Sequence, residues 1–218
     1  MEQNTHHLPD DELGLHDPLA ESFPETLEGR VLFWLAFAFS VFQVSIAAHV
    51  IDLPSQVVRA VHVGFLLAIG LPLLAIAKHR GPLSKVFAYV LAATGVAVAA
   101  YQWVEYTPLL MRAGDPLMLD IVLGVAALVT IFCAAWMLMG PALPIIAGVF
   151  LSYALWGEYL PAPLDHRGYD FSQVIEHLTY GTEGIYGIPV YVSATYIFLF
   201  ILFGAFLEKA GMIKLFTD

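Results

Sequence analysis

Hydrophobic residues in this chain gather into five long stretches that contain no Asp, Glu, Lys or Arg. The stretches are residues 31–51, 60–77, 86–104, 121–157 and 184–207. A helix needs about 20 mostly apolar residues to cross a hydrocarbon core of about 30 Å, so each stretch can form a crossing. The fourth has 37 residues, too many for one crossing, and Pro141 and Pro144 interrupt it. The sequence therefore predicts six spans, at about 31–51, 59–77, 86–105, 118–139, 142–160 and 188–208.

The continuous character of these stretches predicts helices and not a barrel of strands. Membrane-spanning strands are segments of about ten residues in which apolar and polar residues alternate. Composition agrees with a membrane protein, because 59% of the residues are hydrophobic, 13% are charged and the mean hydropathy is +0.76. Soluble domains carry about 25% charged residues. We expect an all-α integral membrane protein with about six transmembrane helices and one short amphipathic helix at the interface.

The net charge of −10 comes mostly from the beginning of the chain, where residues 1–30 hold eight acids and one base. This segment lacks the basic start and short apolar stretch of a secretory signal, and we expect a disordered acidic cytoplasmic tail. His6, His7 and His16 in it fit a solvated tail better than a weak metal site. The nine bases of the chain are scattered, so we expect no nucleic-acid partner.

Lys and Arg are retained on the cytoplasmic side of a membrane, so their distribution predicts the orientation. With the N-terminus inside, six bases fall on the inner side and three on the outer side. The inner six are Arg30, Lys78, Arg80, Lys85, Lys209 and Lys214. The outer three are Arg59, Arg112 and Arg167. We therefore expect a multi-pass protein of the cell (inner) membrane with both termini in the cytoplasm.

The loops differ in length and pattern. Residues 51–59 and 78–85 look like short hairpin connections, and 105–120 is expected to run along the outer surface. Within 160–187, a helical stripe predicts a short amphipathic helix that rests on headgroups or on another protein segment; its members are Phe171, Val174, Ile175 and Leu178. Asp170 and Gln173 resemble a capping box at its start. Gly181, Gly184 and Gly187 then permit a close, irregular entry into the last span, although a flexible connector has the same pattern.

The spans hold no charged residue at their centres, and we expect no enzymatic activity, no catalytic residue, no cofactor and no metal site. Their remaining polar candidates are Gln43, His49, His62, Gln102, Ser193 and Thr195. His49 and His62 raise the alternative of a haem with two axial histidines, but polar residues at helix ends are the commoner case. Cys133, the only cysteine, is expected to be a small buried hydrophobe.

Small residues four apart allow the backbones of membrane helices to approach closely. Three such pairs lie in the predicted spans, namely Gly64 with Ala68, Gly95 with Ala99, and Gly148 with Ser152. We interpret them as packing signals.

Several short motifs then agree, in order and spacing, with one family. The longest are GPALPIIA at 140–147, YALWGEYLP at 153–161, EGIYGIP at 183–189 and FILFGAFLEKAG at 200–211. HRGY at 166–169, VSAT at 192–195, LEGR at 27–30, RAVH at 59–62 and DPLMLDIVLG at 115–124 complete the set. Over about residues 27–218 the chain resembles the fused permeases of tripartite ATP-independent periplasmic (TRAP) transporters, in the branch that works with TAXI-type solute-binding proteins.

The resemblance implies a small four-helix membrane subunit fused to a large twelve-helix one. Residues 31–139 would be the small-subunit-like domain and 140–218 the first two spans of the large permease domain. Such permeases import dicarboxylate-like organic acids with a sodium gradient, after a periplasmic solute-binding protein delivers the substrate. The implied partners are that TAXI-type protein, the remaining large-subunit helices and the bilayer of a bacterial or archaeal cell.

Two departures from the family pattern alter this expectation. Members carry a Glu and an Arg-Arg pair before the Gly-Pro turn, where this chain has Cys133, Trp136 and Met137. Members also continue through many further helices, so we expect this chain alone to be a fragment, a truncated product or half of a split permease that does not transport. A membrane scaffold without transport activity is the alternative.

Overall fold

The computed structural model describes residues 26–77, 81–210 and 212, and these residues contain helices and no strand. Six helical segments are long and apolar enough to cross a membrane, which confirms an all-α membrane protein. Four of them are single helices: α1 (Leu27–Ala47), α2 (Ser55–Ala77), α3 (Pro82–Val104) and α5 (Met118–Met139). The fifth segment, Ala142–Tyr159, consists of α6 (Ala142–Trp156) and a short 3₁₀ turn. The sixth, Ile188–Lys209, is a continuous helix made of α8 (Ile188–Val192), a π-helical segment η3 (Ser193–Ile197) and α9 (Phe198–Lys209).

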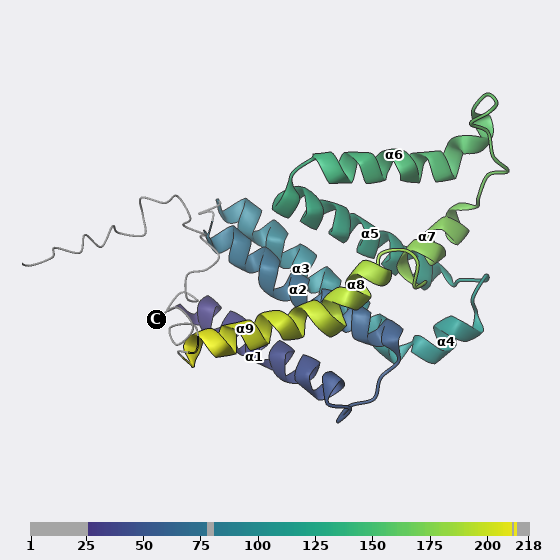
Figure 1. Ribbon diagram of the computed structural model, residues 1–218. Coiled ribbons are helices and arrows are strands. Elements are labelled where there is room, and N and C mark those ends of the chain that lie inside the picture. Colours follow the sequence, from purple (N-terminus) through teal and green to yellow (C-terminus); the bar gives the residue numbers. More distant parts are fainter. Residues whose placement is uncertain (1–25, 78–80, 211, 213–218) are drawn as a thin grey trace, which may run out of the picture.

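The spans lie roughly side by side, in the order α6, α5, α3, α2 and α1 across the molecule, and α9 lies against α1 (Figure 1). The break between α5 and α6 falls at Gly140, whose φ of 86° suits glycine, which lacks a Cβ. The predicted division of the fourth apolar stretch into two spans is therefore confirmed.

The tightest helix contact joins α2 and α3 and depends on two glycines. A Cβ added to Gly64 would lie 2.8 Å from the Cβ of Ala99, and one added to Gly95 would lie 2.5 Å from Cδ1 of Leu67. Real Cβ atoms do not approach 2.8 Å, so Gly64 is needed for the observed backbone spacing. A Cβ at Gly95 would require the Leu67 side chain to shift, because the Leu67 Cβ would lie 3.1 Å away. Two of the three predicted small-residue pairs are thus at a helix interface. Gly148 is different, because a Cβ there would meet Phe132 at an ordinary 3.8 Å.

Three helices begin earlier than expected from the apolar stretches. α1 begins and ends four residues before the predicted 31–51, α2 begins at Ser55 instead of 59, and α3 begins at Pro82 instead of 86. The reason is that polar residues occupy first turns of helices: Thr26 caps α1 by accepting a hydrogen bond from the N–H of Gly29. A search for charge-free residues excludes these turns.

Short helices occupy the end of the bundle where α2 and α5 begin (Figure 1). The predicted surface segment 105–120 contains α4 (Tyr106–Met111), and the predicted amphipathic helix is α7 (Phe171–Thr179). α7 packs against α5 and buries Val174 and Ile175, so its apolar face rests on a protein segment. Asp170 is its N-cap residue, but its side chain makes no capping hydrogen bond, so the predicted capping box is wrong in this respect.

The glycine-punctuated segment after α7 is a close backbone crossing. A Cβ at Gly184 would collide with the carbonyl group of Leu178, and one at Gly181 would lie 2.8 Å from the carbonyl oxygen of His177. The N–H of Ile185 donates to the Leu178 carbonyl at 2.8 Å. This geometry favours the irregular-entry interpretation over a flexible connector.

Some sequence predictions concern residues outside the described ranges. They are the tail up to residue 25 with His6, His7 and His16, the part of the 78–85 loop at 78–80, and Lys214. Cys133, which we expected to be a small buried hydrophobe, is half-buried and packs against the core that α2, α3 and α5 share.

Candidate functional site

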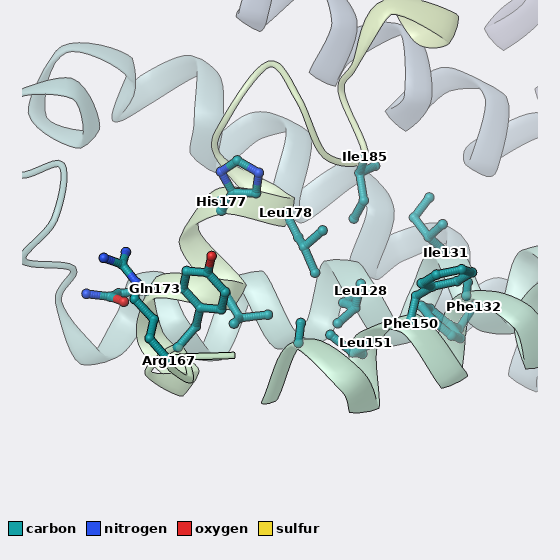
Figure 2. A pocket seen from close by; sticks show the side chains of 14 residues that line it. Leu128, Ile131, Phe132, Phe150, Leu151, Arg167, Gln173, His177, Leu178 and Ile185 are labelled. Carbon is teal, nitrogen blue, oxygen red and sulfur yellow. The ribbon is translucent and has the colours of Figure 1, made fainter. Parts of the chain in front are cut away.

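A pocket of about 880 Å³ lies between α5, α6 and α7, and we call it the α5–α6–α7 pocket (Figure 2). Its volume falls in the range of about 300–1,000 Å³ that small-molecule sites occupy. Most of its lining is apolar and comes from the two spanning helices and α7; the apolar residues are Leu128, Ile131, Phe132, Ala147, Phe150, Leu151, Ala154, Val174, Leu178 and Ile185. The polar lining residues are Arg167, Tyr169, Gln173 and His177.

The pocket exists because α7 packs closely on α5 while α6 stands further away. A Cβ at Gly124 of α5 would lie 2.5 Å from Cγ2 of Ile175 and 2.8 Å from Oγ1 of Thr179. Gly124 thus lets α7 sit directly on the α5 backbone. α6 approaches α5 beside Phe132, where Gly148 leaves ordinary van der Waals space. The volume between these two contacts is the pocket.

The polar mouth of the pocket is held by His166. The N–H of Gly168 donates to Nδ1 of His166 at 3.0 Å, so Nδ1 accepts and Nε2–H donates to the carbonyl of Tyr153 at 2.9 Å. Gly168 has a φ of 73°. This turn presents the Arg167 guanidinium 5.3 Å above the Tyr169 ring, and Arg167 forms no ion pair with any described residue.

A second polar cluster lies inside the bundle and joins α1, α2 and the last span. The amide Nε2 of Gln43 lies 2.7 Å from Nδ1 of His62 and donates to the carbonyl of Ala194 at 2.9 Å. Since the amide nitrogen is a donor, Nδ1 accepts, and Nε2–H of His62 donates to Oγ of Ser193 at 3.1 Å. Gln43 and His62 are both buried, and His62 is neutral in this tautomer.

These contacts fall on the π-helical segment η3, where regular i to i+4 hydrogen bonding is interrupted. Phe39 and Phe198 pack around His62, with Phe39 and Phe198 ring centroids 4.5 Å apart. The π segment is therefore fixed by side chains from the first two helices. π-Bulges in α-helices occur frequently at functional sites.

A third cluster is an ion-pair network at the loop end of α3 and α5. Arg112 donates from Nε to Oδ2 of Asp120 at 2.7 Å and from Nη2 to Oδ1 at 2.8 Å, and it also contacts Glu105 at 3.3 Å. Asp120 is fully buried and accepts further hydrogen bonds from the Tyr101 hydroxyl at 2.5 Å and the Leu117 N–H at 2.8 Å. The hydrogen bonds to Asp120 raise the pKa of Arg112 above its usual value. This network ties the 105–117 segment to α5.

Contacts at Tyr180 and Tyr186 hold two further segments at this end of the molecule. The Tyr180 hydroxyl donates to the backbone carbonyl of Asp120 at 2.7 Å, and burial followed by the nearby Asp120 charge raises its pKa. Burial also raises the pKa of Tyr186, to about 12. Nη1 of Arg59 donates to the Tyr186 carbonyl at 2.7 Å, which anchors the entry to the last span on α2.

The structure separates the polar residues that sequence analysis grouped as candidates. Gln43, His62 and Ser193 converge, whereas the Thr195 hydroxyl donates to its own helix at the Tyr191 carbonyl. Gln102 is buried elsewhere and accepts from Nε2 of Gln56 at 3.3 Å. His49 is exposed beyond α1 with a φ of 54°. Both His62 ring nitrogens are engaged by Gln43 and Ser193, so the arrangement favours a structural role for His62 over haem ligation.

Sequence reasoning missed the partnership of Arg112 and Asp120. It treated Arg112 as an outer charge and Asp120 as the end of the surface segment 105–120, and the seven residues between them include Pro116 and have no helical or strand pattern. An acid in the first turn of an otherwise apolar helix was the available signal.

Comparison with protein-family models, with curated proteins and with solved structures gave no match. The fold and its six spans define a multi-pass α-helical membrane protein.

Proposed function

We propose that the chain is a membrane component of a TRAP-type secondary transporter that imports organic acids with a sodium gradient. In this proposal α1 to α5 form the small-subunit-like part. α6 and the last span are the first two membrane-spanning helices of the large permease part. The remaining helices of the large part and a TAXI-type solute-binding protein complete the system. The ordered motifs over residues 27–218 are the sequence support for this assignment.

The observation that carries the proposal is the contact of Gln43 and His62 with the π segment of the last span. Transporters place irregular helices at their membrane midplane sites and hold them between structural repeats or subunits. Here α1 and α2 supply the side chains, and η3 supplies the irregular backbone through Ser193 and Ala194. The contact joins the two proposed parts at buried atoms, as expected of a scaffold that supports a permease domain.

Exposed apolar faces provide further support for additional helices. α9 buries none of its residues, and its exposed side chains include Phe200, Ile201, Phe203 and Phe206. α6 buries Pro144 alone among its residues. In the proposed assembly, part of these faces packs against the remaining large-subunit spans and part faces lipid.

The orientation belongs to the same proposal. The loop 160–187 and the segment 105–117 lie at one end of the bundle (Figure 1). We assign this end to the periplasm because the sequence places six of the nine bases in segments expected on the cytoplasmic side. The solute-binding protein would then dock at the end that carries α4 and α7. The membrane is the cell (inner) membrane of a bacterium or archaeon.

The test is uptake by proteoliposomes with an inward sodium gradient, a TAXI-type binding protein and labelled organic acids. The 218-residue chain is tested alone and together with a polypeptide that supplies the remaining large-subunit helices. We expect gradient-dependent uptake only in the combined sample, and co-purification of the two polypeptides. The matched control replaces the sodium gradient with a potassium gradient.

Each alternative outcome is informative. Uptake by the chain alone would show a complete pathway and overturn the partial-permease assignment. Association of the two polypeptides without uptake would favour a scaffold, and the absence of association would overturn the proposal.

A further inference from the structure

The α5–α6–α7 pocket combines an apolar interior with a polar mouth at one end. Figure 2 shows Arg167 and Gln173 together at one end and Phe132 with Phe150 at the other. The ligand that matches this distribution is a molecule with a charged head and an apolar tail. We propose that the pocket binds one membrane phospholipid, with its phosphate at Arg167 and an acyl chain between α5 and α6.

The depth of the pocket fits a single leaflet. Phe132 lies fourteen residues after Met118, the first residue of α5, which is about 21 Å along a helix at 1.5 Å per residue. Half of a bilayer that is 40–45 Å thick with its headgroups is also about 21 Å. Phe132 is thus near the midplane, and α7, which carries Gln173 and His177, contacts α5 at Gly124, only about 9 Å from the start of α5.

The same geometry argues against a transmembrane helix as the occupant. α5 and α6 converge at the Gly140 turn (Figure 1), and on that side of Phe132 the space between them is a separate pocket of about 390 Å³, lined also by Trp136 and Ile145. A helix that crosses the whole bilayer needs a groove along its full length, whereas an acyl chain needs only one leaflet. The pocket therefore favours a lipid over a further span.

Arg167 supplies the charge complementarity. It is exposed at the mouth, stacks on Tyr169 and has no ion-pair partner among residues 26–77, 81–210 and 212. Arginine binds phosphate oxygens through paired N–H groups. Gln173 and His177 add hydrogen-bonding groups beside it, and His177 also lies 3.7 Å from the Glu183 carboxylate.

The experiment is native mass spectrometry of the purified 218-residue chain. The protein is delipidated by extended washing in mild detergent and then titrated with phosphatidylethanolamine, phosphatidylglycerol or the corresponding diacylglycerol. We expect one phospholipid per chain at low concentration and weaker retention of diacylglycerol. The comparison of the two phospholipids distinguishes a zwitterionic from an anionic headgroup.

Three variants separate the head and tail contacts. Arg167→Gln is expected to weaken phospholipid retention about tenfold and to leave diacylglycerol retention unchanged. Ala154→Phe fills the pocket and is expected to abolish retention of all three lipids. Ala205→Phe, at an exposed position of α9, is the matched control and is expected to bind as the unmodified chain does.

Thermal unfolding of each variant verifies that it is folded. If Ala154→Phe does not fold, Arg167→Gln still provides the test, because Arg167 lies on an exposed loop. Equal retention by the unmodified chain and Arg167→Gln would overturn the headgroup assignment. No retained phospholipid, or a bound polypeptide in its place, would overturn the lipid site. The outcome is independent of uptake activity, so it is distinguishable from a failure of the proposed transport function.

Discussion

Arg112 and Asp120 form a two-point ion pair at the start of α5, with N–O distances of 2.7 and 2.8 Å. The Asp120 carboxylate is fully buried and collects two further hydrogen bonds, from the Tyr101 hydroxyl and the Leu117 N–H. Its charge is therefore compensated entirely within the protein. Removing one partner leaves a buried charge, which costs more than removing both.

We expect Arg112→Ala to lower thermal stability in detergent strongly, because it leaves the Asp120 carboxylate without its cation. The double variant Arg112→Ala with Asp120→Asn is expected to recover part of the loss. Arg167→Ala, which removes an arginine without an ion pair in the described chain, is the control. A double variant less stable than Arg112→Ala would contradict this account.

Substitutions at the α2–α3 interface test the close backbone approach. Gly64→Ala is expected to destabilise the protein by about 1–3 kcal/mol through overpacking against Ala99. Gly70→Ala in the same helix meets no atom within 4 Å and is expected to be neutral or slightly stabilising. Unfolding in mixed micelles, followed by helicity, measures both. Adding Ala99→Gly to Gly64→Ala should restore stability, and a lack of rescue would assign the effect elsewhere.

The polar cluster around His62 predicts local protection of the last span. Gln43→Leu removes the donor to the Ala194 carbonyl and the partner of His62, so hydrogen exchange in 193–198 should accelerate by roughly threefold to twentyfold. Thr195→Val, which removes a hydroxyl bonded within its own helix, is the comparison. Equal acceleration in both variants would mean that α1 does not hold the π segment.

The raised pKa of Tyr186, about 12, predicts a loss of stability at high pH. The unfolded chain releases this proton near pH 10 while the folded chain retains it. Unfolding therefore becomes more favourable as pH rises from about 10 to about 12, by at most about 1.4 kcal/mol per pH unit. When the folded Tyr186→Phe variant is titrated and followed by tyrosinate absorbance, the curve should contain one fewer tyrosine that ionises near pH 12. An unchanged titration curve would exclude Tyr186 as that group.

The topology is tested with single cysteines at Thr5 and Asp170 in a Cys133→Ala background. An impermeant thiol reagent on intact cells should label the cysteine at 170, because the 160–187 loop is expected outside. The cysteine at 5 should react only after lysis. Labelling at 5 and not at 170 would reverse the orientation.

The sequence was sufficient for the spans, the Gly140 break and α7, since these depend on the length and period of apolar runs. It was also sufficient for the packing of Gly64 and Gly95, because small residues four apart in a membrane helix indicate a surface where another helix can approach closely. It was not sufficient for the starts of α1 and α2, where polar residues such as Glu28 and Ser55 occupy the first turns.

Long-range partnerships could not be predicted for a different reason. Gln43, His62 and Ser193 were each recognised as polar candidates, but nothing local indicates that the last span returns to α1 and α2. The pocket at α7 is similar, because it results from the difference between two helix contacts on α5, at Gly124 and beside Phe132. Such features depend on the relative placement of helices and not on any one pattern.

The separation of Gln43 and His62 from their partners along the chain has a consequence for synthesis. Ala194 is made 151 residues after Gln43, and Ser193 is made 131 residues after His62. At roughly 5–20 residues per second, the His62 interval corresponds to roughly 7–26 s of translation. Throughout this time α1 and α2 carry polar side chains in the bilayer without their final acceptors. The nascent hairpin therefore depends on the bond between Gln43 and His62, on water or on the insertion machinery until the sixth helix arrives.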